Sequence, residues 1–385
     1  MQYRELRDTL LPILQCTTCL SSKLTLVSGD LGIRALDLLH NEHIVCISCN
    51  ARYPITEDFI PVMWTPFLRE ALLNQTDNFS NIRANVVVYN SISDDYQIYT
   101  RQHPSVALRV RNAVKRIVDY ENIDRGYHLD FGCGPGHVLG WLTQPNFLQI
   151  GLDVSINNLR NAHRNSGALV VWGDATNMPF SKEAFDVVTE SSALHHIEDW
   201  KSVISESCRV CKKTGGVLID SEPSSDQMAW GPLAIAVFNA RFPFYRILSY
   251  IKRDKYLFRN IKQAKRNLQA EIDHQPGTGF PLEELRSSFE GAGFAADIIV
   301  SPDPELRSVA APDWKSIVLN VLSGRNPWNP RYGSFTVIAK PMQRTENLTI
   351  RADHLGRHYH VCPTGRTKVV GSDLEVSKAW SNDTK

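Results

Sequence analysis

The sequence predicts an α/β protein whose larger domain is a seven-stranded, largely parallel sheet with helices on both faces. From residue 127 onward, short apolar runs alternate with amphipathic segments of helical period, which is the pattern of strands joined by crossover helices. The first of these apolar runs leads into a glycine-rich turn. Two pairs of closely spaced cysteines precede this region and predict a separate, small β-rich unit near the N-terminus.

The glycine-rich turn lies within Tyr127–Leu142, whose sequence is YHLDFGCGPGHVLGWL. Glycine at positions Gly132, Gly134 and Gly136 permits positive φ angles or the close approach of a ligand. The helix that follows would offer free N–H groups and the positive end of its dipole to an anionic or polar ligand. A dinucleotide-binding turn needs its third glycine at position 137, where this chain has His137. The spacing therefore disfavours a dinucleotide.

Three further strands are predicted after the glycine turn. The apolar run 147–153 ends in Asp153, about 20 positions past the turn, where a carboxylate can accept hydrogen bonds from both ribose hydroxyls of a nucleoside. The third strand, Ala168–Trp172, leads into Asp174, and the fourth, Phe185–Glu190, is followed by the segment SSALHHI. Acidic residues thus stand at the ends of successive predicted strands.

The order of these motifs resembles that of the class I S-adenosylmethionine-dependent methyltransferases, and in particular the type 11, ubiquinone/menaquinone-biosynthesis-like group, over residues 85–341. The resemblance implies a Rossmann-like methyltransferase sheet and S-adenosyl-L-methionine as the methyl donor. In that family, the segment around Asp174 holds the adenine, and the segment after the fourth strand closes the site beside the methionine part. The implied cofactor-binding residues are Asp130, Phe131, Gly132, Gly134, Gly136, Asp153, Val154, Asp174, Ala175 and Glu190.

Methyl transfer from a sulfonium is an in-line displacement, so most of the catalysis can come from holding the nucleophile, carbon and sulfur collinear. A general base is needed only if the acceptor must lose a proton. His195 and His196, just past the fourth strand, are the best-placed bases, and we take His195 as the candidate catalytic residue. His274 is a second candidate on the substrate side. Either of the paired histidines could instead orient the cofactor.

The N-terminal cysteines form two C-x-x-C pairs separated by 26 residues, a gap that allows the second pair to return on a β-hairpin. Four thiolates fill a tetrahedral zinc site and leave no open position, so we expect structural Zn²⁺; four reduced cysteines without metal are the alternative. The segment resembles the zinc-ribbon domain that activates tRNA and protein methyltransferases, but has Phe59 where that family has glycine. The predicted ligands are Cys16, Cys19, Cys46 and Cys49.

Further strands are expected at 217–221, 295–300 and 334–339, the last antiparallel, and further helices at 106–118, 199–210 and 282–292. Arg109, on the first of these helices, is expected on a solvated face. Tyr89, Tyr96 and Tyr99 could cover the methionine end of the cofactor or be ordinary packing aromatics.

We predict that the chain is divided into four segments. They are 1–65, a zinc ribbon; 66–125, a helical linker and cofactor lid; 126–341, the methyltransferase domain with an inserted substrate cap at 222–280; and 342–385, a polar tail without regular structure.

The composition limits the partners and the compartment that we expect for this protein. The net charge of +1 gives no bulk electrostatic attraction to nucleic acid or membrane. The first residues lack the apolar core of a signal peptide, and the longest uncharged apolar run, Met228–Phe238, is too short to span a bilayer. Paired cysteines that suit a metal favour a reducing compartment, so we expect a cytoplasmic protein. The oligomeric state is not predicted.

The large, aromatic-rich cap favours a small-molecule acceptor that is aromatic, quinone-like, or linked to a lipid or glycan. An RNA (rRNA or tRNA) methyltransferase is the alternative, since the stretch 252–266 interleaves basic and aromatic residues and a bacterial ribosomal-RNA methyltransferase also places a zinc ribbon ahead of such a domain. The same stretch could make peripheral contact with an anionic membrane. A second alternative is a cofactor-binding scaffold without turnover.

Overall fold

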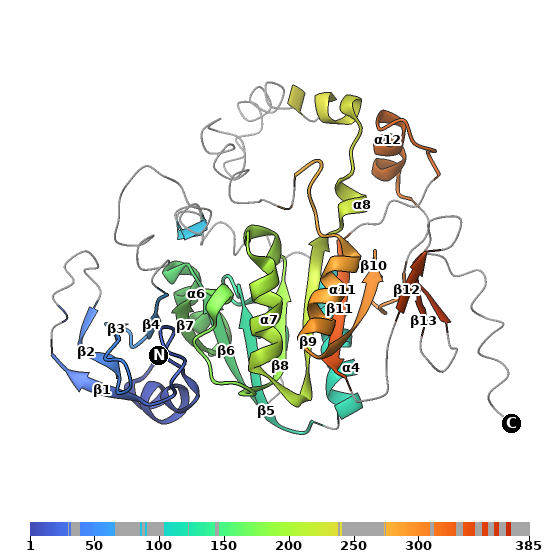
Figure 1. Cartoon of the computed structure of the whole chain (residues 1–385). Coiled ribbons are helices and arrows are strands. Elements are labelled where there is room, and N and C mark those ends of the chain that lie inside the picture. The colour runs from blue at the N-terminus through green and yellow to red at the C-terminus, as the bar shows by residue number, and fades with distance from the viewer. Residues whose placement is uncertain are drawn as a thin grey trace, which may run out of the picture.

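The computed structural model describes residues 1–29, 31, 39–65, 85–86, 89–90, 104–121, 123–142, 146–237, 239–240, 273, 275–308, 312–328, 334–342, 349–352, 358–361 and 367–370 of the 385. A central sheet flanked by helices occupies the middle of the molecule, and the small sheet of the N-terminal unit lies at one edge of it (Figure 1). Most of the predicted linker, the lid residues Tyr96 and Tyr99, the basic stretch 252–266 and His274 lie outside the described residues.

The central sheet has eight strands in the order β10-β11-β9-β8-β5-β6-β7-β4. Neighbouring strands from β9 to β4 are parallel, whereas β11 runs antiparallel to both β10 and β9. Seven of the eight are the predicted strands, so the predicted α/β class and the antiparallel last strand are confirmed. The strands are β4 (Val62–Met63), β5 (Gly126–Phe131), β6 (Phe147–Asp153), β7 (Leu169–Gly173), β8 (Phe185–Ser191), β9 (Cys211–Pro223), β10 (Phe294–Val300) and β11 (Ser334–Pro341).

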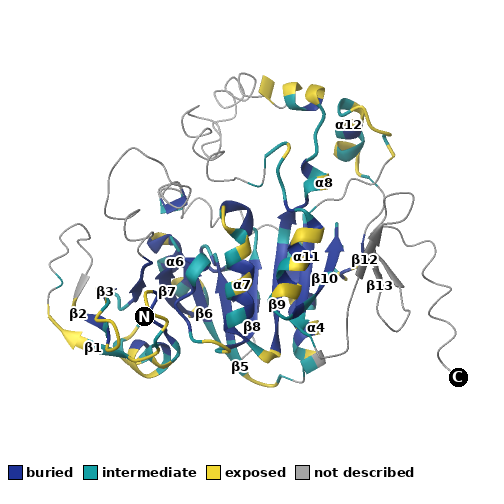
Figure 2. Ribbon diagram, viewed as in Figure 1, coloured by how far each residue is buried: buried dark blue, intermediate teal, exposed yellow. Residues whose placement is uncertain are grey.

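Helices cover both faces of this sheet. In front of it in Figure 1, α7 (Trp200–Val210) and α11 (Leu282–Gly291) pack side by side. On the other face, α4 (Pro104–Glu121) contacts β9 and also α5 (His137–Trp141), and α5 contacts α6 (Ile156–Ser166). Strand β7 is buried along its whole length, as expected for a parallel strand covered on both faces (Figure 2).

The N-terminal unit consists of the short helical turns α1 (Tyr3–Glu5), η1 (Leu6–Leu10) and η2 (Leu11–Ile13) and the antiparallel strands β1 (Leu24–Ser28), β2 (Leu39–Cys46) and β3 (Arg52–Thr56). Its last strand, β4, does not stay with it but pairs in parallel with β7 at the edge of the central sheet. The Trp172 N–H donates to the Pro61 carbonyl at 3.0 Å, and the Gln15 N–H donates to the Pro179 carbonyl at 2.9 Å. Side chains of both parts also share one hydrophobic core. The N-terminal unit is therefore built onto the central sheet, which the sequence did not indicate.

Three local expectations are corrected. Arg109 is buried rather than solvated, since it forms an ion pair inside the molecule. Strand β9 begins at Cys211, six residues before the start of the strand predicted at 217–221, and a register shift against β8 accommodates the extra length. Within the tail expected to lack regular structure, β12 (Thr349–Ala352), β13 (His358–Val361) and β14 (Thr367–Val370) form an antiparallel sheet.

Among the described residues, no helix is both long enough and apolar enough to cross a bilayer.

Candidate active site

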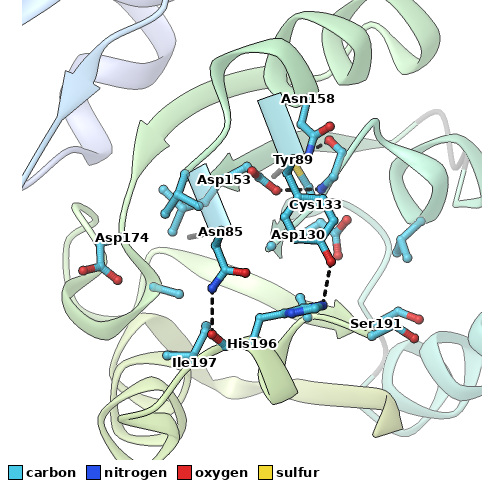
Figure 3. A pocket seen from close by; sticks show the side chains of 18 of the residues that line it. Asn85, Tyr89, Asp130, Cys133, Asp153, Asn158, Asp174, Ser191, His196 and Ile197 are labelled. Atoms are coloured by element: carbon cyan, nitrogen blue, oxygen red, sulfur yellow. Dashed lines mark hydrogen bonds between the residues drawn. The ribbon is translucent and has the colours of Figure 1, made fainter. Parts of the chain in front are cut away.

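A cavity of about 820 Å³ lies at the carboxyl ends of β5, β6, β7 and β8 (Figure 3). In an open α/β sheet this is where ligands bind, and the volume suits a small-molecule ligand. Seven of the ten residues implied as cofactor-binding line it, whereas Phe131, Gly136 and Glu190 do not. The seven are Asp130, Gly132, Gly134, Asp153, Val154, Asp174 and Ala175.

The glycine turn has a left-handed backbone, with φ of 61° at Gly132, 50° at Gly134 and 86° at Gly136. A Cβ at Gly132 would lie 2.4 Å from the Cβ of Ala193, which belongs to the segment after β8. A Cβ at Gly136 would lie 2.8 Å from the Ala162 Cα in α6. Gly132 therefore lets two walls of the cavity meet, while Gly136 serves the packing of two helices.

Asp153 joins the tip of β6 to the glycine turn. Its Oδ2 accepts the Gly134 N–H at 2.8 Å, and its Oδ1 accepts the Ser155 N–H at 2.7 Å. The residue is only 8% exposed, and burial raises the pKa of its carboxyl to about 6 although these hydrogen bonds oppose the shift. Each carboxylate oxygen has two lone pairs. A ligand in the cavity can therefore still donate to both oxygens.

Two more carboxyl groups stand at strand ends on the cavity wall. The Asp174 Oδ1 accepts the Thr176 N–H at 2.9 Å, and burial raises the pKa of the Asp174 carboxyl. The Asp130 Oδ1 accepts the Thr189 hydroxyl at 2.7 Å, and burial raises the pKa of Asp130 well above its ordinary value. Burial thus favours the protonated form of Asp130 as long as no positive charge enters the cavity.

The described lining of the cavity is acidic. It includes five carboxyl groups and no lysine or arginine. Such a wall attracts a cation and repels a phosphate. The carboxyl groups belong to Asp130, Asp153, Asp174, Glu198 and Asp199.

Glu190 is buried and does not line the cavity. With Glu222 it holds the turn η4 (Leu194–His196) from beneath: Glu190 Oε1 and Glu222 Oε1 accept the Leu194 N–H at 3.1 and 3.0 Å. Glu190 also accepts the Ala193 N–H. Burial, together with the charge of the other glutamate, raises the pKa of Glu190 well above its usual value, and burial raises that of Glu222 to about 8. Glu222 could not be predicted, because no residue near it in the sequence marks it as the partner of Glu190.

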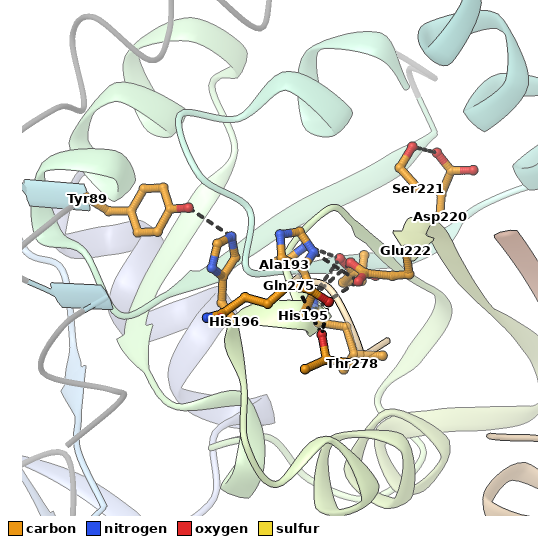
Figure 4. Close-up of polar contacts among 11 residues, drawn as sticks. Tyr89, Ala193, His195, His196, Asp220, Ser221, Glu222, Gln275 and Thr278 are labelled. Atoms are coloured by element: carbon orange, nitrogen blue, oxygen red, sulfur yellow. Dashed lines mark hydrogen bonds and ion pairs between the residues drawn. The ribbon is translucent and has the colours of Figure 1, made fainter. Parts of the chain in front are cut away.

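The two histidines of η4 lie side by side but contact different partners (Figure 4). His195, the predicted catalytic residue, is buried outside the cavity lining, with Nδ1 at 3.0 Å from the Glu222 Oε2, and burial lowers its pKa to about 4. His196 lines the cavity, and its Nε2 lies 2.8 Å from the Tyr89 hydroxyl. Successive residues of a 3₁₀ turn are about 120° apart, which lets the two side chains reach different partners although their ring centroids lie only 4.1 Å apart. The histidine at the wall is His196.

Asn85 and Tyr89 bring a second wall to the cavity. The Asn85 Nδ2 donates to the His196 carbonyl at 2.9 Å, and the Asn90 Oδ1 accepts the Ser155 hydroxyl at 2.7 Å. The lid position predicted for Tyr89 fits this arrangement, whereas Asn85 and Asn90 carried no signal in the sequence. The described lid residues thus join η4 to the start of α6.

The four N-terminal cysteines converge. Their sulfur atoms all lie within 4.8 Å of one another, with Cys16 Sγ 3.6 Å from Cys49 Sγ and Cys19 Sγ 3.6 Å from Cys46 Sγ. A tetrahedral zinc site with Zn–S bonds of about 2.3 Å requires sulfur atoms about 3.8 Å apart. The donor set and its spacing fit Zn²⁺.

Phe59 occupies the turn where the resembled ribbon family has glycine. Its φ is 62°, so this turn keeps the left-handed conformation with a phenylalanine in place. The ring packs edge-on against Tyr3, with centroids 5.8 Å apart. Backbone strain at Phe59 is accompanied by an aromatic contact that glycine could not make.

Comparison with known proteins places residues 129–219 in a family described as a methyltransferase domain. A methyltransferase of Synechocystis is 38% identical over 28% of this chain and 52% of its own length. The demethylmenaquinone methyltransferase of Anoxybacillus flavithermus is 27% identical over 54% of this chain and 85% of its own length. A tRNA (carboxymethyluridine(34)-5-O)-methyltransferase of Arabidopsis thaliana is 35% identical over 28% of each chain.

The chain thus spans about half the length of the first of these relatives and less of the third. Among solved structures, a complex of the Haloferax volcanii Trm112 methyltransferase activator with a methyltransferase aligns with 66% of this chain and 98% of its own, at 14% identity and a TM-score of 0.41. The family match includes Asp130, Asp153 and Asp174. The chain carries a class I S-adenosylmethionine-dependent methyltransferase domain.

Proposed function

We propose that the protein transfers the methyl group of S-adenosyl-L-methionine to a small-molecule acceptor, or to one linked to a lipid or glycan, by in-line displacement. The observation that carries the donor assignment is the acidic cavity wall, which has five carboxyl groups and no lysine or arginine among its described residues. The donor brings a sulfonium and an ammonium into that wall. A phosphate-bearing cofactor would meet repulsion there instead.

Different residues of the cavity wall would bind different parts of the donor. Asp153 would accept the two ribose hydroxyls and Asp174 the adenine amino group, with Val154 and Ala175 beside the base. Asp130 and the glycine turn at Gly132 and Gly134 would hold the methionine part. Ionisation of these buried acids is favoured once positive charge is present, so binding and charge neutralisation reinforce each other.

For an acceptor that must lose a proton, we propose the pair Tyr89 and His196 in place of His195. As the acceptor atom bonds to the methyl carbon and the carbon–sulfur bond breaks, the acceptor proton would pass to the Tyr89 oxygen. The Tyr89 proton would pass to His196 Nε2, which is 2.8 Å away. Asn85 holds the backbone of His196, and the ring of His195 lies 4.1 Å from the His196 ring, centroid to centroid. Glu190 and Glu222 would position η4 and so act on the pair through the backbone.

We further propose that Cys16, Cys19, Cys46 and Cys49 bind one structural Zn²⁺ in a protein of the cytoplasm. The ion would fix the fold of the N-terminal unit and, through β4, the edge strand beside β7. All four ligand positions would be filled by thiolates, so the ion would take no part in the chemistry.

RNA is the second candidate acceptor class. The sequence similarity to a plant tRNA methyltransferase and the seven lysine and arginine residues between 252 and 266 favour it. The net charge of +1 and the acidic cavity argue against it, because phosphate neutralisation supplies most non-specific affinity for RNA. Binding to bulk RNA that falls steeply with salt would favour this alternative.

Calorimetry and methyl transfer test the proposal together. The protein is titrated with S-adenosyl-L-methionine and, separately, with NAD⁺; we expect heat of binding only with the first. It is then incubated with methyl-labelled donor and fractionated cell extract, and label is expected in a small-molecule or lipid fraction. Binding of NAD⁺ but not of the methyl donor would refute the donor assignment, and label in the RNA fraction would replace the acceptor class.

A further inference from the structure

Apolar side chains gather on the surface at one end of the molecule. Of the ten large hydrophobic side chains that are exposed in the described part of the chain, six belong to two segments, 232–237 and 312–328. Monomeric proteins rarely leave such a group uncovered, and apolar patches of this kind mark interaction sites. We call these six residues the apolar end face; they are Leu233, Val237, Trp314, Val318, Val321 and Trp328.

Helix α12 (Trp314–Leu322) exposes large apolar side chains and buries a polar one. Trp314, Val318 and Val321 are four and three residues apart, so they share one side of the helix, and all three are exposed, Trp314 by 70%. The one residue of α12 that is buried is the polar Asn320. A surface helix of a globular protein ordinarily buries its apolar stripe and exposes its polar one. The outward side of α12 is therefore built to meet something apolar.

The helix at 232–237 continues this face. Leu233 and Val237 are exposed and lie one turn apart. The Gly231 N–H donates to the Ser323 hydroxyl at 3.1 Å, and a Cβ at Gly231 would lie 2.7 Å from the Ser323 Cα. The start of this helix thus touches the end of α12. In Figure 2 both segments lie beyond α8 (Ser225–Met228), which follows the carboxyl end of β9, so the face is at the end of the sheet that holds the cavity.

The charges at the face are mainly positive. Residues 232–237 contain none. In the segment 312–328, the one acidic residue, Asp313, is engaged as the cap of α12, where its Oδ1 accepts the Ser316 N–H at 2.7 Å. The two basic residues, Lys315 and Arg325, are exposed, and the Lys315 Nζ lies 5.8 Å from the centre of the Trp314 ring. Tryptophan flanked by basic side chains suits the boundary between lipid headgroups and acyl chains.

We propose that the apolar end face docks on the surface of an anionic lipid bilayer, with Trp314 and Trp328 at the level of the headgroups. A symmetric contact between two copies of the chain would set Lys315 and Arg325 of one copy against those of the other. Anionic headgroups neutralise the same charges. Charge complementarity therefore favours lipid over a second copy.

Docking in this way would bring the end of the sheet with the cavity toward the bilayer. If the proposed methyl transfer holds, the acceptor is then an amphiphile drawn from the membrane. This consequence rests on the proposed function, whereas the docking does not. Vesicle binding is measured without a methyl donor, so either proposal can fail while the other stands.

Vesicle flotation of the full chain tests the docking. The wild-type protein should float with vesicles of phosphatidylcholine mixed with phosphatidylglycerol and bind less to phosphatidylcholine alone, and its tryptophan emission should shift to the blue. Trp314→Ser and Trp328→Ser should each weaken the partition on the order of tenfold, since each removes a large apolar side chain from the contact. Lys315→Glu with Arg325→Glu should remove the preference for the anionic vesicles.

The matched control is Ile47→Ser, which removes an exposed apolar side chain of the N-terminal unit, away from the face. It should bind vesicles as the wild type does. Failure of the wild type to float, or equal binding by Trp314→Ser and the wild type, would overturn the proposal. Sedimentation without vesicles tests whether the face binds a second copy of the chain. A wild-type dimer that Trp314→Ser converts to a monomer would assign the face to that contact instead of to lipid.

Discussion

Arg109 and Asp220 form a two-point ion pair behind the cavity, with Arg109 Nε 2.8 Å from Asp220 Oδ1 and Nη2 2.9 Å from Oδ2. Both side chains are buried. The Arg109 Nη2 also donates to the hydroxyl of Ser221, a residue of the cavity lining, at 2.6 Å. The pair ties α4 to the end of β9 and so fixes one side of the site. Removing one partner of such a pair strongly destabilises the fold, because the remaining charge is buried away from water and unpaired.

Replacing Arg109→Met should therefore lower the free energy of unfolding by about 3–5 kcal/mol, because Asp220 would be left as a buried charge. Arg111→Met is the matched control: Arg111 is exposed on the same helix and donates to the Trp141 carbonyl, and we expect it to cost about 1 kcal/mol or less. Urea denaturation measures both. Equal losses in the two variants would contradict the burial of Arg109.

Asp153 should control the affinity for the methyl donor. Asp153→Ala removes two charge-assisted hydrogen bonds and should cost about 3 kcal/mol of binding free energy, as measured by calorimetry. The pKa of this carboxyl in the unliganded protein is raised to about 6 by burial, so it is protonated below that pH and loses acceptor capacity. Wild-type affinity should accordingly rise as the pH increases through 6 and then level off. Asp153→Asn should lack this rise; a rise that persists in the variant would assign it to another group.

His196, rather than its neighbour, should affect turnover. For an acceptor that loses a proton, His196→Gln should lower kcat by about 10²–10⁴-fold, and Tyr89→Phe should also lower it. His195→Gln is the control, since His195 lies outside the cavity lining; it should lower stability more than kcat. The rate is measured in single-turnover assays, with the extract fraction that takes up label as the source of acceptor. A loss of kcat confined to His195→Gln would restore His195 as the base.

Removing zinc should destabilise the whole chain rather than the N-terminal unit alone. Strand β4 belongs to the central sheet, and the two parts share one core, so chelation should lower the stability of both in a single transition. Metal analysis should find one zinc per chain in the wild type and none in Cys49→Ser. Cys208→Ser, which replaces a buried cysteine outside the cluster, should keep its zinc. Two separate unfolding transitions after chelation would show that the edge pairing is weak.

Phe59 offers a test of the left-handed turn in the ribbon. Both Phe59→Ala and Phe59→Gly remove the ring that packs against Tyr3, but only alanine keeps the strain of a positive φ. Phe59→Gly should therefore be more stable than Phe59→Ala by about 1 kcal/mol, as measured by denaturant unfolding. Equal stability would mean that the turn does not need the left-handed conformation.

Local patterns in the sequence predicted much of the fold. Apolar runs, the glycine turn and the caps depend on residues near one another in the chain, and the strands ending at Asp153 and near Asp174 and the helix capped by Asp199 all lie where the periodicity put them. The convergence of the strand-end carboxyl groups also follows, because parallel strands bring their carboxyl ends to one edge. The cysteine spacing likewise predicted a cluster that the structure brings together.

By itself, then, the sequence determined the sheet, its order of motifs and the types of group at its carboxyl edge, since backbone period and spacing are local properties. Only the tertiary structure decided that His196 and not His195 faces the cavity, that Glu222 lies beneath η4, that Arg109 is buried against Asp220 and that β4 joins the central sheet. Each of these depends on which side of an element another element covers. Such a choice is made by packing between residues 28 to 111 positions apart in the chain, or by a turn too short to show a period.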